Sequence, residues 1–145
     1  MRMNCLIVDD EEISRKILER FVAQTDSLKL AGSCENAIDA VNILKTKDVD
    51  LIFLDIEMPE MTGIELIETL KVNPQIIFVT AKEDYAVEAF EHNVTDYLLK
   101  PLTYARFLKS VNKAQDNIKQ HLSAVSPGYI FIKVESRLLR LNLSD

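Results

Sequence analysis

Short apolar runs alternate with longer stretches of mixed polarity along the first 122 residues of the chain. The apolar runs are rich in Val, Ile, Leu and Phe, which is typical of buried strands. The stretches between them repeat apolar residues at helical spacing. The predicted strands cover residues 3–8, 28–33, 50–55, 75–80 and 95–99. This alternation predicts an α/β fold, a doubly wound five-stranded parallel sheet with helices on both faces.

The helix boundaries are marked by capping residues and by proline. Asn36 and Thr103 can each cap a helix, and Thr62-Gly-Ile-Glu65 has the spacing of a capping box. Asn73-Pro74 is expected to end the helix that Thr62 begins. The predicted helices cover residues 11–25, 36–45, 62–71, 84–92 and 103–122.

The apolar positions of three helices predict the faces that pack on the sheet. The expected inner residues are Ile13, Ile17, Leu18, Phe21 and Val22 in the first helix, Ile38, Val41 and Leu44 in the second, and Phe107, Leu108, Val111, Ala114 and Ile118 in the last. The strand at residues 28–33 is the weakest of the five, which places it near an edge of the sheet.

A different pattern follows residue 122. Residues 123–128, Ser-Ala-Val-Ser-Pro-Gly, have the composition of a linker. Residues 129–145 contain two strand-like runs around a polar turn, which predicts a β-hairpin. Because a hairpin alone is only marginally stable in water, we interpret it as the first strands of a second domain that is truncated here.

Composition and charge limit the function classes. The net charge is −6, from 17 basic and 23 acidic residues, which argues against nucleic-acid binding by this stretch of chain. Cys5 and Cys34 fit no metal-binding spacing, so we expect buried thiols in a reducing, cytoplasmic setting. No apolar run suits a signal peptide or a membrane span, and we expect no membrane partner.

Polar side chains follow four of the predicted strands, at the point where each strand ends. They are Asp9-Asp10, Asp55, Thr80 and Lys100. Because the carboxyl ends of parallel strands meet at one edge of a sheet, these side chains are expected to converge. Taken singly, each residue has an ordinary structural explanation, such as a turn, a helix N-terminus or a solvated lysine. Their combination at successive strand ends favours a functional site.

The predicted cluster suits a divalent cation and a phosphoryl group. Mg²⁺ prefers hard oxygen ligands and bridges to phosphate. Asp10 and Asp55 would ligate it directly, Asp9 would act through water, and the Glu57 main-chain carbonyl would complete the set. Asp55 could then act as a carboxylate nucleophile that forms an acyl phosphate.

Four segments carry a resemblance to a known family. They are Leu6-Ile-Val-Asp-Asp-Glu11, Leu54-Asp-Ile-Glu-Met-Pro-Glu-Met-Thr-Gly63, Phe78-Val-Thr-Ala81 and Asp96-Tyr-Leu-Leu-Lys-Pro101. With these motifs, residues 1–122 resemble the receiver domain of bacterial two-component response regulators. The resemblance implies the strand order 2-1-3-4-5, a phosphoryl group transferred from a sensor histidine kinase to Asp55, and Mg²⁺ held at the acidic pair.

The same resemblance assigns roles to the other site residues. It implies that Thr80, Ala81 and Lys100 hold the phosphoryl group, and that Tyr97 turns inward when Thr80 moves. It also implies a cis peptide bond before Pro101. Glu57 and Lys82 occupy positions that influence the phosphoryl lifetime in the family, and we hypothesise that they form an ion pair over the site.

The tail and one helix refine the resemblance. Residues 129–145 resemble the opening strands of a LytTR-type DNA-binding domain, which implies a transcriptional output with DNA bound only through the missing sequence. Apolar residues on a short helix are normally core, but some near the fourth helix could form, with the last helix, a homodimer surface in the phosphorylated protein. They are Tyr85, Val87 and Phe90. His92 and His121 match no receiver motif and are interpreted as surface residues.

Two other function classes remain open at this point. A haloacid-dehalogenase-type phosphohydrolase also uses Asp, Thr, Lys and Mg²⁺, but its nucleophile follows the first strand, with a second Asp two residues later. Here the first strand ends in the adjacent pair Asp9-Asp10. A phosphorylation-independent interaction module on the same fold is the second alternative. The favoured interpretation is a phosphoacceptor switch rather than an enzyme.

Overall fold

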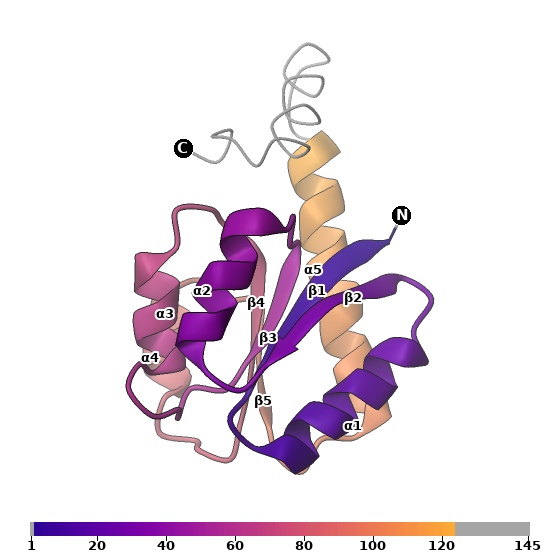
Figure 1. The fold of residues 1–145 in the computed structure, drawn as a ribbon. Helices are drawn as coiled ribbons and strands as arrows, with labels where there is room; N and C mark the ends of the chain where they lie inside the picture. Colours follow the sequence, from indigo (N-terminus) through magenta and orange to yellow (C-terminus); the bar gives the residue numbers. More distant parts are fainter. Residues whose placement is uncertain (1, 124–145) are drawn as a thin grey trace.

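A five-stranded sheet lies at the centre of the protein, whose computed structural model describes residues 2–123 (Figure 1). All neighbouring strands are parallel, in the order β2-β1-β3-β4-β5. The strands are β1 (Met3–Val8), β2 (Leu28–Cys34), β3 (Leu51–Leu54), β4 (Gln75–Thr80) and β5 (Asp96–Leu99). The predicted fold class, strand order and edge position of β2 are confirmed.

Helices cover both faces of the sheet. They are α1 (Glu12–Ala23), α2 (Ala37–Thr46), α3 (Gly63–Thr69), α4 (Ala86–Glu91) and α5 (Tyr104–Ser123). Helices α1 and α5 lie on one face, and α2, α3 and α4 lie on the other (Figure 1). The predicted caps form: the Asn36 side chain accepts from the Asp39 amide, and Thr62 and Glu65 make a reciprocal capping box.

Each face of the sheet has its own apolar core. On the α1–α5 side, the Phe107 ring stacks on Phe53 with centroids 5.0 Å apart and packs against Phe21 at 5.3 Å. On the other side, Leu54 of β3 and Phe78 of β4 are buried in one cluster with Leu66 of α3 and with residues of α2 and α4. Burial of this kind is the main favourable contribution to folding, and it fixes the strand ends that carry the site.

Two predicted core residues are exposed. Ile13 of α1 is 71% exposed and Ile38 of α2 is 51% exposed. The inner face of α1 is formed by Ser14, Leu18 and Val22, which are buried and spaced four residues apart. In α2 the buried residues are the small Ala37 and Ala40. The predictions for Ile13 and Ile38 were therefore wrong.

A partly buried polar contact joins β5 to α5. The Arg106 guanidinium donates two hydrogen bonds to the Asp96 carboxylate, at 2.9 and 3.1 Å, and Ser110 Oγ donates a third at 2.6 Å. Burial alone would raise the Asp96 pKa, but the Arg106, Ser110 and Tyr97 N–H donors outweigh it and lower the pKa to about 2.

We therefore expect Asp96→Asn to destabilise the protein in a pH-dependent way. A lowered pKa stabilises the fold above the ordinary value of 3.8, and this contribution disappears as the pH falls through about 2. At pH 7 the free energy of unfolding of Asp96→Asn should be about 2 kcal/mol lower than that of the wild type. Urea unfolding followed by circular dichroism at pH 7, 4 and 3 measures it. An Asp96→Asn difference that does not shrink between pH 4 and pH 3 would contradict this assignment.

The predicted second-domain fragment at residues 129–145 lies outside the described residues. Helix α5 ends at Ser123, the first residue of the predicted linker, and the rest of that linker also lies beyond the described part. Within residues 2–123, none of the helices combines the length and the apolar character needed to cross a bilayer.

Candidate functional site

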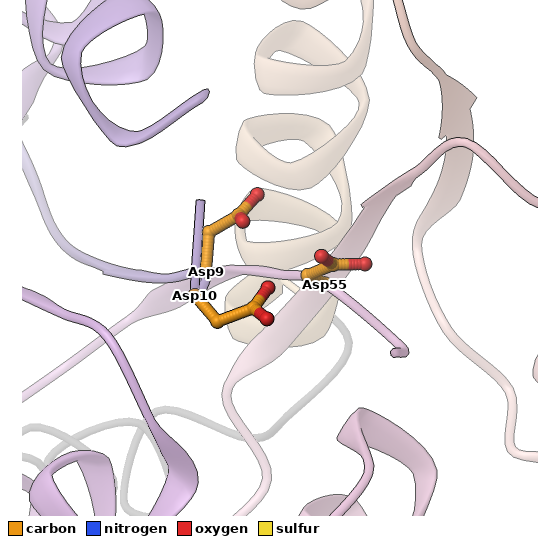
Figure 2. Close-up of side chains that lie close together, drawn as sticks. All are labelled: Asp9, Asp10 and Asp55. Carbon is orange, nitrogen blue, oxygen red and sulfur yellow. The ribbon is translucent and has the colours of Figure 1, made fainter. Parts of the chain in front are cut away.

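The three predicted acidic residues meet at one edge of the sheet. Asp9 and Asp10 follow β1, and Asp55 follows β3, the adjacent strand. Each offers a carboxylate oxygen, and these oxygens all lie within 4.8 Å of one another (Figure 2). Asp9 and Asp55 are only 1% and 6% exposed, whereas Asp10 faces solvent. Two negative charges are thus held in a buried position.

Lys100, at the end of β5, supplies the opposing charge. Its Nζ lies 3.0 Å from Asp9 Oδ2 and 3.5 Å from Asp55 Oδ2. A third carboxylate oxygen, Glu11 Oε1, lies 3.4 Å from the same ammonium, and Ser14 Oγ donates a hydrogen bond to that oxygen. Glu11 was not among the predicted site residues, although it belongs to the acidic run after β1.

The protonation equilibria of these groups are strongly perturbed. Burial, followed by the charge of Asp9, raises the pKa of Asp55 to about 6, against the opposing effect of Lys100. Burial also raises the pKa of Asp9. For Lys100, burial would lower the pKa, but the neighbouring carboxylates of Asp9 and Asp55 outweigh it and raise the pKa. Without a further cation, the cluster is therefore short of positive charge.

Backbone contacts position the two buried aspartates. The Asp55 amide donates to the Val8 carbonyl at 2.9 Å, which ties the ends of β1 and β3 together. The Glu11 amide donates to Asp9 Oδ1 at 2.9 Å, and the Glu57 amide donates to Asp55 Oδ1 at 3.3 Å. Both carboxylates are thus oriented by main-chain N–H groups of the loops that follow them.

Gly63, the first residue of α3, packs closely against the main chain of Asp55 and Ile56. A Cβ atom at this position would lie 2.5 Å from the Asp55 carbonyl oxygen and 3.0 Å from Ile56 Cα. The Gly63 amide also donates to the Ile56 carbonyl at 2.8 Å. The absence of a side chain therefore lets α3 begin directly against the Asp55 main chain.

Thr80 lies at the end of β4 and is buried, with its hydroxyl oxygen accepting from the Lys82 amide at 3.3 Å. The Tyr97 hydroxyl donates to the Lys82 carbonyl, and the Tyr97 ring packs edge-on against Phe78. The Lys82 main chain therefore links the two predicted switch residues, Thr80 and Tyr97. This link could not be predicted from the sequence, because it depends on the path of the loop after β4.

The remaining site predictions have different outcomes. The Lys100–Pro101 peptide bond is cis, as the resemblance implied. Ala81 is exposed, directly after Thr80. Glu57 and Lys82 are both exposed, and no ion pair joins their side chains in the described part of the chain. Their effect on the phosphoryl lifetime stays a prediction.

The donor set fits a hard divalent cation. Asp9 Oδ2 is buried and, among residues 2–123, accepts no well-directed hydrogen bond, although the Lys100 ammonium lies nearby. The single Lys100 ammonium faces two buried carboxylates, so a second cation would offset the remaining buried negative charge. Three carboxylates that converge at one edge of the sheet, two buried and one exposed, are the kind of ligands that Mg²⁺ prefers. Asp9, Asp10 and Asp55 are the described side chains that would hold it.

Comparison with known proteins agrees with this geometry. The family model of the response regulator receiver domain matches residues 5–112. The chain belongs to the response regulator receiver family. This receiver is 32% identical in sequence to the response regulatory domain of protein mrkE from Klebsiella pneumoniae, with a TM-score of 0.75 over 81% of this chain and 99% of that one.

Curated relatives of this receiver are longer than the chain itself. An uncharacterized response regulatory protein of Vibrio parahaemolyticus is 38% identical over 132 residues, which are 86% of this chain and 54% of the relative. The transcriptional regulatory protein BtsR of Escherichia coli K12 is 34% identical over 148 residues, which are 97% of this chain and 62% of BtsR. The chain thus spans between half and two thirds of these relatives.

Proposed function

We propose that this receiver accepts a phosphoryl group on Asp55 from a sensor histidine kinase, in a reaction that depends on Mg²⁺. The observation that carries the proposal is the convergence of Asp9, Asp10, Asp55 and Lys100 at one edge of the sheet. Membership of the receiver family supports it. The domain is better described as a phosphoacceptor switch than as an enzyme, because the phosphorylated domain is itself the product of the reaction, even though the domain catalyses its own phosphorylation and dephosphorylation.

In the proposed transfer, a carboxylate oxygen of Asp55 attacks the phosphorus of the kinase phosphohistidine. The new P–O bond forms as the P–N bond breaks, and the imidazole leaves with the bonding electron pair. Lys100 lies close enough to Asp55 to hold a phosphoryl oxygen. Thr80 can turn its hydroxyl toward another phosphoryl oxygen, and the main-chain amide of Ala81, the exposed residue after Thr80, is proposed to donate to the same group. Mg²⁺, when bound, neutralises charge on the carboxylates and the phosphoryl group.

The proposed switch passes from Thr80 to Tyr97. A phosphoryl group adds negative charge and acceptor oxygens at Asp55. If the Thr80 hydroxyl turns toward them, the Lys82 amide loses its acceptor, and the Lys82 carbonyl that holds the Tyr97 hydroxyl shifts with it. Tyr97 is then released to move inward, and α4 and β5 repack.

The output of this switch is proposed from the relatives and from the tail. BtsR is a transcriptional regulatory protein and matches almost the whole chain. We propose that phosphorylation promotes homodimerisation through the face around α4, where Val87 and Phe90 are 75% and 84% exposed. DNA binding would belong to a LytTR-type domain that begins near residue 129, and the protein would act in the cytoplasm.

Phosphorylation of Asp55 is tested by intact mass spectrometry after incubation with Mg²⁺ and acetyl phosphate. We expect the wild type to gain one phosphoryl group, and Asp55→Asn to gain none. Chelation of the metal should abolish the gain. Equal gains in both proteins would show that Asp55 is not the acceptor. No gain in the wild type with acetyl phosphate or with a phosphorylated kinase would favour a phosphorylation-independent interaction module instead.

A further inference from the structure

His92 joins the end of α4 to α3. Its Nδ1 lies 2.9 Å from the Glu88 carbonyl oxygen, one turn earlier in α4, and its Nε2 lies 3.1 Å from Glu68 Oε2 of α3. Helix α4 has little else to hold it, since Ala89 is its one buried residue. Helix α3, in contrast, buries Gly63, Ile64 and Leu66 and carries a complete capping box. The histidine therefore connects a weakly packed helix to a firmly packed one.

Both partners of the His92 ring are hydrogen-bond acceptors. A carbonyl oxygen and a carboxylate oxygen have no proton to donate, and a neutral imidazole carries only one N–H group. The two hydrogen bonds can therefore form together only when the ring is protonated. The bond to the Glu88 carbonyl and then the Glu68 carboxylate raise the pKa of His92 above its ordinary 6.5, against a smaller opposing effect of burial.

We propose that His92 is a proton-dependent tether that holds α4 to α3 and makes the phosphorylation response of this receiver sensitive to pH. The coupling to phosphorylation rests on the proposed function, because α4 is the helix that repacks in the proposed switch. The charged groups that face the ring are Glu68 from α3 and Glu88 from α4. Neither belongs to the acidic cluster, so the tether acts apart from the phosphoacceptor site.

The direction of the pH effect follows from protonation of the folded state. A histidine whose pKa is raised by folding stabilises the folded arrangement below pH 6.5, and this contribution is lost as the pH rises through the raised value. Low pH should therefore keep α4 in the arrangement seen here and oppose its repacking. High pH should release it.

Hydrogen exchange of the unphosphorylated protein tests the tether itself. After correction for intrinsic rates, protection of the α4 amides should fall about 1.5- to 5-fold between pH 6 and pH 8.5, the range expected for one solvent-accessible ion pair. His92→Gln and Glu68→Gln should each remove this dependence. His121→Gln is the matched control, because it removes the other histidine of the chain, and it should leave the dependence intact. A dependence that survives in His92→Gln, or disappears in His121→Gln, overturns the tether.

Beryllofluoride, a mimic of the phosphoryl group, tests the coupling in the presence of Mg²⁺. At pH 6 the wild type should bind it about 1.5- to 5-fold more weakly than His92→Gln, and at pH 8.5 the two affinities should be equal. The same ratio at both pH values overturns the coupling. Absence of binding by both proteins at every pH overturns the proposed function instead, while hydrogen exchange still decides whether the tether exists.

Discussion

Replacement of Gly63 by alanine is expected to destabilise the protein by about 3 kcal/mol, at the upper end of the cost of overpacking a well-filled site. The added Cβ would lie 2.5 Å from the Asp55 carbonyl oxygen and 3.0 Å from Ile56 Cα. Both atoms belong to the main chain, so neither can move aside by changing a rotamer. Alanine is favoured over glycine in a helix by only about 1 kcal/mol. The clash is therefore the larger effect.

The same substitution should also impair phosphorylation, because relief of the clash must shift the loop that carries Asp55. Urea unfolding and the rate of phosphorylation by acetyl phosphate measure the two effects. Gly32→Ala is the matched control. Its Cβ would lie 3.0 Å from Ile43 Cδ1 and 3.2 Å from Leu6 Cδ1, which are ends of side chains that can adjust. A Gly63→Ala protein within 1 kcal/mol of the Gly32→Ala protein would show that α3 can move away from Asp55 at low cost.

The site was largely predictable because strand order brings distant residues together in a regular way. Asp9, Asp55 and Lys100 each come directly after a strand and Thr80 is the last residue of β4, and parallel pairing places all of those strand ends at one edge. The position along the strand was thus enough to predict the cluster of Asp9, Asp55 and Lys100, while the phosphoryl-binding role of Thr80 stays a prediction. The cis bond at Lys100–Pro101 could be predicted only from the resemblance, since local sequence does not determine it.

The inner faces of the helices were harder to predict. In α1, Ile13 and Ile17 compete with Ser14 and Leu18 for the inward position, and the structure buries Ser14, whose hydroxyl is satisfied by Glu11. An apolar count cannot anticipate that a buried serine will have a partner. In α2, the inward positions are alanines. The distance at which a helix packs on the sheet decides how large its inward residues can be, and a single sequence does not reveal that distance.

Loop geometry was the least predictable part of the site. Glu60, in the loop between Asp55 and α3, has a φ of 70°, although a glutamate gives no signal for the left-handed region. The bridge from Thr80 through the Lys82 main chain to Tyr97 likewise depends on backbone atoms, which every residue carries. Contacts that use main-chain groups leave no trace in side-chain identity.

The acidic cluster leads to a second large effect: Asp55→Asn should stabilise the metal-free protein at pH 8. The Asp55 side chain is only 8% exposed, and folding raises its pKa from 3.8 to about 6. A carboxyl group with a raised pKa favours folding at low pH, and that advantage is lost as the pH rises from about 4 through about 6. At pH 8 the charged Asp55 therefore opposes folding. Its replacement by a neutral amide should raise the free energy of unfolding by about 1–3 kcal/mol.

Unfolding in the presence of a chelator, at pH 8 and at pH 4.5, separates this charge effect from other consequences of the substitution. The advantage of Asp55→Asn should shrink at the lower pH, where the wild-type carboxyl is protonated in the folded protein. Mg²⁺ should then stabilise the wild type more than the variant, because a bound cation compensates the charge that the variant lacks. Asp96→Asn makes the same chemical change at the first residue of β5. It should be destabilising at pH 8, because the wild-type Asp96 carboxylate already has Arg106 as a partner. An Asp55→Asn protein that is less stable than the wild type without metal would mean that Lys100 alone balances the cluster.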